Sequence, residues 1–114
     1  MKNKSIFLLI FVSMTVTSLV CVPVMASIPA WGEDEDYGEH QSWAWAWLYA
    51  EYDPHTGTYH NIQHNWDWAV WGPYYYWIWE LYSDDVDHPA TRTVIFYSTD
   101  GINYYPDADA YVQF

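Results

Sequence analysis

An antiparallel all-β domain is the fold class that the sequence predicts. Large aromatic residues alternate with small or polar residues in several short runs, and a period of two is typical of strands with two unlike faces. Pro and Gly separate these runs, and Asp100-Gly101 has the composition of a tight hairpin turn. No stretch after residue 27 has a convincing helical period. We expect a β-sandwich of two antiparallel sheets with about 5–7 strands, with a small β-barrel as the alternative.

The N-terminal segment, residues 1–26, has the pattern of a secretory signal peptide that is helical in the precursor. Two lysines precede an apolar run over residues 6–22, and Val24 and Ala26 are compact residues shortly before Ser27. This pattern predicts cleavage between Ala26 and Ser27. A retained membrane anchor is the alternative, because the apolar run approaches the length of a membrane span. We expect a secreted, extracellular protein, with the periplasm or the cell surface as other destinations.

The chain that remains after cleavage is strongly acidic. Residues 27–114 contain Arg92, no lysine and fifteen Asp and Glu residues, which gives a formal charge of 1 − 15 = −14. This charge argues against a nucleic-acid partner and against an amphipathic helix on anionic lipid. Cys21 leaves with the signal, so we expect a dense aromatic core, a bound ion or self-association to replace a disulfide. No later stretch is apolar enough to span a membrane as a helix.

Residues 27–41 are expected to form an acidic flexible arm ahead of a single all-β domain over residues 42–114. The arm contains four consecutive acidic residues at positions 33–36, with Glu39 close by. Like charges at this density repel one another and resist compaction. The arm is therefore predicted to be solvated.

The strands of the domain are predicted from their alternation. Residues 42–50 alternate aromatic and small side chains, which places Trp43, Trp45 and Trp47 on one face of a strand. Residues 53–57 follow as a loop, because Pro and Gly fit its turn positions. We expect the three tryptophans to pack inward against Trp66, Trp68, Trp77 and Trp79 of the facing sheet. Further strands are predicted over residues 64–70, 74–82, 92–99 and 110–114.

Asp100-Gly101 is the predicted hairpin turn before a strand over residues 102–105 that Pro106 ends. The surrounding Ser98-Thr99-Asp100-Gly101-Ile102-Asn103-Tyr104 is similar to the Asp-box turn of sialidase-type propellers, Ser-x-Asp-x-Gly-x-x-Trp. It departs from that pattern because Gly directly follows Asp and Tyr stands in place of Trp. An Asp box is a folding turn, so the resemblance implies a stable turn and gives no argument for catalysis.

The chain has more aromatic side chains than one small core comfortably holds, with nine Trp and twelve Tyr. Tyrosines are the favoured surface candidates, because the hydroxyl suits partly wet positions. Exposed aromatic patches mark interaction sites. The predicted ligand-binding residues are Trp71, Tyr74, Tyr75, Tyr76, Tyr104 and Tyr105.

A metal site is a second possibility. His60 and His64 have the spacing of a zinc or copper pair on a helix, but on a strand they lie roughly 13 Å apart. His55 in the preceding loop is the candidate that folds back toward His60. We expect no required cofactor, with copper, zinc or calcium as alternatives. The oxygen ligands for calcium, in a loop without the EF-hand pattern, are Asp84, Asp85 and Asp87.

The sequence lacks the usual parts of a catalytic site. No Cys nucleophile or Lys remains after cleavage, and the chain has neither a Gly-x-Ser-x-Gly elbow nor a phosphate loop. We expect a non-enzymatic binding or interaction module for a glycan, a cell-surface polymer or a protein. An exported metal-binding protein is the first alternative. A bacteriocin-like secreted effector is the second, although membrane-active peptides are mostly cationic.

Overall fold

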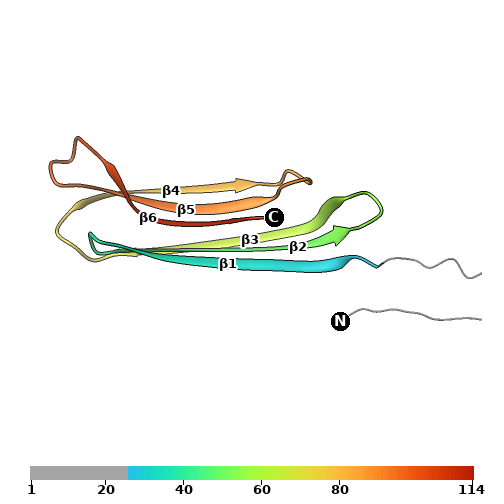
Figure 1. The fold of residues 1–114 in the computed structure, drawn as a ribbon. Helices are drawn as coiled ribbons and strands as arrows, with labels where there is room; N and C mark the ends of the chain where they lie inside the picture. Colours follow the sequence, from blue (N-terminus) through green and yellow to red (C-terminus); the bar gives the residue numbers. More distant parts are fainter. Residues whose placement is uncertain (1–25) are drawn as a thin grey trace, which may run out of the picture.

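The computed structural model describes residues 26–114 as two antiparallel three-stranded sheets that stack face to face (Figure 1). This arrangement confirms the predicted β-sandwich. The described residues include no helix that could cross a membrane. The predicted signal peptide lies outside the described residues, apart from Ala26 at its end. The first sheet has the order β1 (Ile28–Gly38), β2 (Ser42–Asp53), β3 (Thr58–Val70), and the second has the order β4 (Tyr75–Ser83), β5 (Ala90–Ser98), β6 (Tyr105–Gln113).

Small side chains fill the space between the sheets. Ala44 and Ala46 of β2 meet Ile95 of β5 and Ala108 and Ala110 of β6, and all five are fully buried. Alanines let two sheets approach closely, whereas stacked sheets with larger side chains sit about 10 Å apart. The partly buried residues that pack against this core are Val70, Tyr76, Ile78 and Val112.

The tryptophans of β2 lie on the outside of the sandwich. Trp43, Trp45 and Trp47 alternate with the buried alanines, so they point away from the second sheet. Trp77 and Trp79 of β4 also point outward, with 63% and 43% of their surfaces exposed. The prediction that these rings pack inward is therefore wrong. Alternation assigns residues to two faces, but it does not say which face is buried. In β2 the face with the smaller side chains is inside, whereas in β3 the inner face carries Trp66 and Trp68, in the same sheet as β2.

The acidic segment is a strand, so the prediction of a flexible arm is wrong for residues 28–38. The pleat of β1 separates neighbouring charges onto opposite faces, with Glu33 and Glu35 outside and Asp34 and Asp36 inside. Each inward carboxylate accepts a hydrogen bond from a backbone N–H of β6. These contacts replace the repulsion expected from the sequence with charge-assisted hydrogen bonds between the two sheets. Their donors are Asp109 N at 2.8 Å and Tyr111 N at 2.9 Å.

A polar cluster ties the β1–β2 turn to the second sheet. The side chain of Asp107 is only 3% exposed and accepts hydrogen bonds from Ser42 Oγ at 2.6 Å and from the His40 backbone N–H at 3.1 Å. The imidazole of His40 stacks on Tyr97 with 3.6 Å between ring centroids. Tyr76 donates its hydroxyl to the carbonyl of His40 at 2.6 Å. Residues from both sheets therefore hold this end of the sandwich closed.

The loop between β5 and β6 is longer than the predicted two-residue hairpin. Asp100 accepts hydrogen bonds from the backbone N–H groups of Ile102 and Asn103, at 2.8 and 2.9 Å, and Gly101 has a φ of 75°. The loop covers residues 99–104, so the prediction of a strand over 102–105 that ends at Pro106 is wrong. Pro106 instead lies inside β6, next to an irregularity in the pairing with β5. Proline is tolerated there because β6 is an edge strand and its register is locally shifted.

Candidate functional site

The outer face of the first sheet carries four aromatic side chains along its central strand. These residues, Trp43, Trp45, Trp47 and Tyr49 of β2, form the aromatic row. All four are half-buried. Neighbouring strands flank the row with carboxylates and amides. By register, the flanking residues on the same face are Trp31, Glu33, Glu35 and Tyr37 of β1 and Gln63, Asn65, Asp67 and Ala69 of β3.

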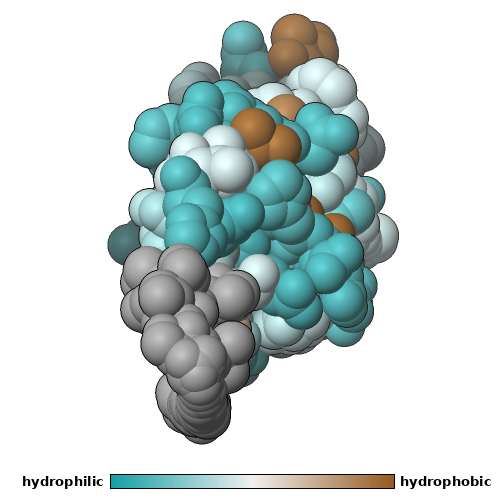
Figure 2. Space-filling model, turned by 90° about the vertical axis from the view of Figure 1, so that its right-hand side faces the viewer, coloured by the Kyte–Doolittle hydropathy of each residue, from teal (hydrophilic) through white to brown (hydrophobic). Residues whose placement is uncertain are grey.

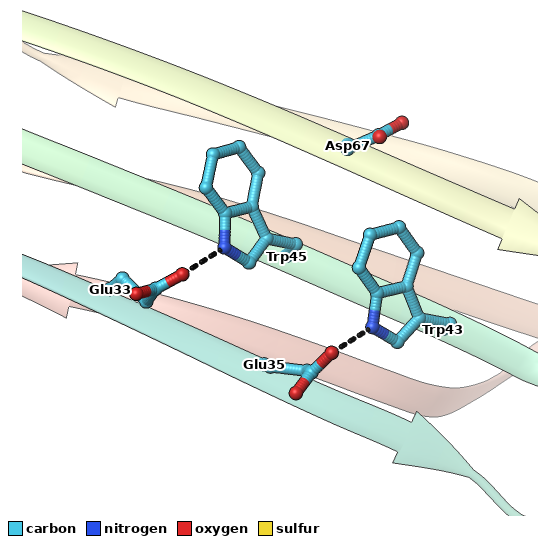
Figure 3. A pocket seen from close by; sticks show the side chains of 5 residues that line it. All are labelled: Glu33, Glu35, Trp43, Trp45 and Asp67. Atoms are coloured by element: carbon cyan, nitrogen blue, oxygen red, sulfur yellow. Dashed lines mark hydrogen bonds between the residues drawn. The ribbon is translucent and has the colours of Figure 1, made fainter.

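Hydrogen bonds to β1 fix the orientation of two of these rings. The indole N–H of Trp43 donates to Glu35 Oε2, and that of Trp45 donates to Glu33 Oε2, each over 2.7 Å. Figure 3 shows both indoles face-on and in the same orientation, with their N–H edges toward β1 and their six-membered rings toward β3. An indole donates a hydrogen bond in its own plane. The polar edge of each ring is thus satisfied within the protein, and its face stays available to a ligand.

The other end of the row is equally ordered. The rings of Trp47 and Tyr49 are nearly parallel, with 11° between their planes and 6.3 Å between their centroids. The hydroxyl of Tyr49 donates to Glu51 Oε2 at 3.1 Å. Burial and the hydrogen bond to the Glu51 carboxylate raise the pKa of Tyr49 above its usual value. Tyr49 is therefore neutral at physiological pH, and the row presents uncharged rings beside anionic neighbours.

A shallow open pocket of about 310 Å³ lies over this face. It is lined by Trp43 and Trp45, by Glu33 and Glu35 on one side, and by Asp67 on the other (Figure 3). Glu33 and Glu35 are exposed, and each uses one carboxylate oxygen to accept an indole N–H. The pocket therefore has aromatic walls and three carboxylates from two different strands.

The structure does not bring the six predicted ligand-binding residues into one site. Tyr74 packs edge-on against His40 and Tyr97, on the inner side of the second sheet, and Tyr76 donates its hydroxyl to the His40 carbonyl. Tyr104 lies against Trp77 on the outer face of that sheet, with 6.4 Å between ring centroids. The predicted residues with at least a third of their surface exposed are Trp71, Tyr75, Tyr104 and Tyr105.

The predicted metal ligands are also dispersed. His55 lies in the β2–β3 turn, the ring of His60 bonds to Thr58 Oγ1 at 2.9 Å, and His64 stacks on Tyr82 with 3.7 Å between centroids. No group of three or more His, Cys, Asp or Glu residues within residues 26–114 is placed to hold a metal ion. The end of the sandwich with the β2–β3 turn and the β4–β5 loop is largely hydrophilic (Figure 2). The carboxylates in the β4–β5 loop are exposed there, namely Asp84, Asp85 and Asp87.

The sequence does not predict the aromatic row as a site, because the burial of aromatic surface favours a position for those rings in the core. The missed signal was the identity of the alternating partners. Ser42, Ala44 and Ala46 alternate with the tryptophans of β2 and form a smooth inner face. The acidic run of β1 places Glu35 opposite Trp45 and Glu33 opposite Trp47. No family model, curated protein or solved structure matches this chain.

Proposed function

We propose that this protein is a non-enzymatic binding module that holds an extended ligand along the aromatic row. The observation that carries the proposal is the pair of hydrogen bonds from Trp43 and Trp45 to Glu35 and Glu33. They hold two outward-facing indoles in one orientation before any ligand arrives. Pre-ordered aromatic side chains lose little conformational entropy on binding, and aromatic residues supply much of the energy of known interfaces.

The shape of the site supports binding of a long ligand. The row follows the central strand of a three-stranded sheet, and the pocket between its first two rings is open to solvent. The carboxylates of Glu33 and Glu35 serve the indoles as hydrogen-bond acceptors, which gives them a positioning role. A ligand can lie across the face without entering an enclosed cleft. The N-terminal signal pattern alone supports the further proposal that the module acts outside the cytoplasm.

Retention on immobilised polymers tests this function. The purified protein is passed over chitin, cellulose, peptidoglycan and immobilised polylysine, and retention is followed by tryptophan fluorescence. Trp43→Ala with Trp45→Ala removes two rings of the row. Trp79→Ala, on the outer face of the second sheet, is the matched control. We expect retention on at least one polymer, an affinity reduced about tenfold or more in the double variant, and no change in the control.

Two results would contradict the proposal. One is that none of the polymers retains the unmodified protein. The other is that the double variant, shown to be folded by its circular dichroism spectrum, is retained as well as the unmodified protein. Loss of retention only in Trp79→Ala would move the binding surface to the second sheet and would equally overturn the assignment to the aromatic row.

A further inference from the structure

We infer that the pocket between Trp43 and Trp45 binds an organic cation, and that the ligand of the aromatic row is an extended basic polypeptide with Lys or Arg at alternate positions. This inference rests on the proposed binding function and names its ligand class. It is carried by the coincidence of aromatic faces, carboxylates and strand spacing at one place.

Among residues 26–114, the carboxylates around the pocket have no cationic partner. Glu33 and Glu35 border it on one side and Asp67 on the other. Arg92 is the single Lys or Arg in the described part of the chain. It lies in β5 of the second sheet and pairs with Asp109 through hydrogen bonds of 2.9 and 2.6 Å. The pocket therefore keeps its negative potential, which attracts cationic ligands and repels anionic ones.

The aromatic walls favour the same ligand charge. The face of an indole carries the negative end of the ring quadrupole, and ammonium or guanidinium groups bind over it within about 6 Å of the ring centroid. Donation of the indole N–H to a carboxylate makes the face of the ring more negative. Trp43 and Trp45 both donate in this way. A cation over these rings reaches a carboxylate at either side of the pocket, whereas a neutral sugar leaves those charges without a counter-ion.

The distance between successive rings of the aromatic row favours a polypeptide over other cationic ligands. Residues on the same face of a strand are two positions apart, which is about 6.6–6.8 Å. Trp43, Trp45 and Trp47 have this spacing, and Glu33 and Glu35 repeat it on β1. An extended peptide places its alternate side chains at the same distance. Lys or Arg side chains at every second residue therefore meet successive rings and successive glutamates in register.

Peptide binding to charge-neutralised variants tests the inference. The probes are a synthetic peptide that alternates Lys and Ser over the length of β2, and the same peptide with Gln in place of Lys. Glu33→Gln, Glu35→Gln and Asp67→Asn are combined in one variant. The amide oxygens introduced at positions 33 and 35 can still accept the indole hydrogen bonds, so we expect the rings to keep their orientation while three charges are lost. The control variant also loses three carboxylate charges, but outside the pocket. It combines Asp84→Asn, Asp85→Asn and Asp87→Asn in the β4–β5 loop.

We expect that the Lys peptide binds the unmodified protein and quenches or shifts tryptophan emission, and that the Gln peptide binds at least about tenfold more weakly. The pocket variant loses affinity for the Lys peptide by a similar factor, whereas the loop variant loses much less. Added salt weakens binding to the unmodified protein more than it weakens binding to the pocket variant.

Other results would overturn the inference in distinguishable ways. Equal loss in the pocket and loop variants would mean that the peptide responds only to net charge. Tighter binding of a chitosan oligosaccharide than of the Lys peptide would assign the cation to an amino sugar and refute the polypeptide. Retention on a neutral polymer that depends on Trp43 and Trp45, without any effect of the pocket variant, would leave the binding function standing and refute the cation. If no polymer and no peptide binds, both proposals fail.

Discussion

The carboxylate of Asp36 accepts a hydrogen bond from the backbone N–H of Asp109, 2.8 Å away on the opposite sheet. Asp34 makes the same contact with the N–H of Tyr111, at 2.9 Å. β6 is the last strand of its sheet, so these N–H groups belong to an edge that would otherwise be open to another strand. The inward-facing Asp34 and Asp36 therefore accept hydrogen bonds from the edge strand β6. The outward-facing Glu33 and Glu35 orient two indoles of the aromatic row.

Replacement of both inner aspartates by alanine is expected to destabilise the protein by about 1–3 kcal/mol, because two backbone donors lose charged acceptors. The variant Asp34→Ala, Asp36→Ala should also self-associate, since the edge of β6 becomes available for pairing. Urea unfolding and light scattering measure the two effects. Asp34→Asn with Asp36→Asn keeps an acceptor at each position and should lie closer to the unmodified protein in both measurements. Equal behaviour of the two double variants would show that the hydrogen bonds to β6 are unimportant.

Gly38→Ala is expected to destabilise the sandwich by about 1–3 kcal/mol through overpacking. A methyl group at this position would overlap the side chains of Asp107 and Ser42, which are already hydrogen-bonded to each other. The matched control is Gly32→Ala on the same inner face of β1. There the added carbon would lie 3.0 Å from Val112 Cγ1, and an aliphatic side chain can move aside. The midpoint of urea unfolding should therefore fall more in Gly38→Ala than in Gly32→Ala, and the reverse order would refute this account.

The alternation of residues predicts the strands of this protein better than it predicts their orientation. Residues 42–50, 64–70, 74–82 and 92–99 all lie largely within β2 to β5. The burial of aromatic surface favours an inward orientation for the tryptophans of β2, yet the alanines of this strand are the residues that face the interior. Which face of β2 is buried depends on the side chains of the facing sheet. Its Ala108 and Ala110 leave room for a thin core, and they are distant from β2 in the sequence.

The sequence does not predict the candidate site, for a related reason. Charge repulsion within residues 33–36 predicts a flexible arm, because the segment taken alone has four carboxylates and no side chain that donates a hydrogen bond to them. The donors come from elsewhere: indole N–H groups of β2 on one face and backbone N–H groups of β6 on the other. The contacts to β2 follow from strand register, and those to β6 follow from how the two sheets stack. Short-range sequence patterns contain neither.

Lowering the pH should destabilise the protein partly through His64. Burial against Tyr82 lowers the pKa of His64 below its usual value, so folding favours the neutral form of this imidazole. The unfolded chain binds the proton more readily. The stabilisation is fully present above the ordinary pKa of about 6.5 and is lost as the pH falls through the folded-state pKa. Between about pH 7.5 and pH 5.5 the melting temperature should fall less in His64→Phe than in the unmodified protein.

A replacement at an exposed histidine provides the control for this experiment. His55→Asn, in the β2–β3 turn, should follow the unmodified protein across the same pH range. If His64→Phe and the unmodified protein have parallel melting profiles, the pH dependence arises from other groups. The aromatic replacement keeps a flat ring against Tyr82, so a difference between the profiles reports the titration rather than the loss of packing.

Asp100 should stabilise the β5–β6 loop in a way that disappears in acid. The backbone N–H groups of Asn103 and Ile102, together with Ser98 Oγ, hold the pKa of the Asp100 carboxyl far below its usual value. Because the folded-state pKa is depressed, this stabilisation is present above the unfolded-state pKa of about 4 and is lost as the pH falls through the folded-state value. Asp100→Asn keeps one side-chain oxygen but removes the charge. Its melting temperature should be lower than that of the unmodified protein at neutral pH, and the gap should narrow steadily below about pH 4. A gap of constant size from neutral pH into strong acid would mean that the charge of Asp100 does not stabilise the loop.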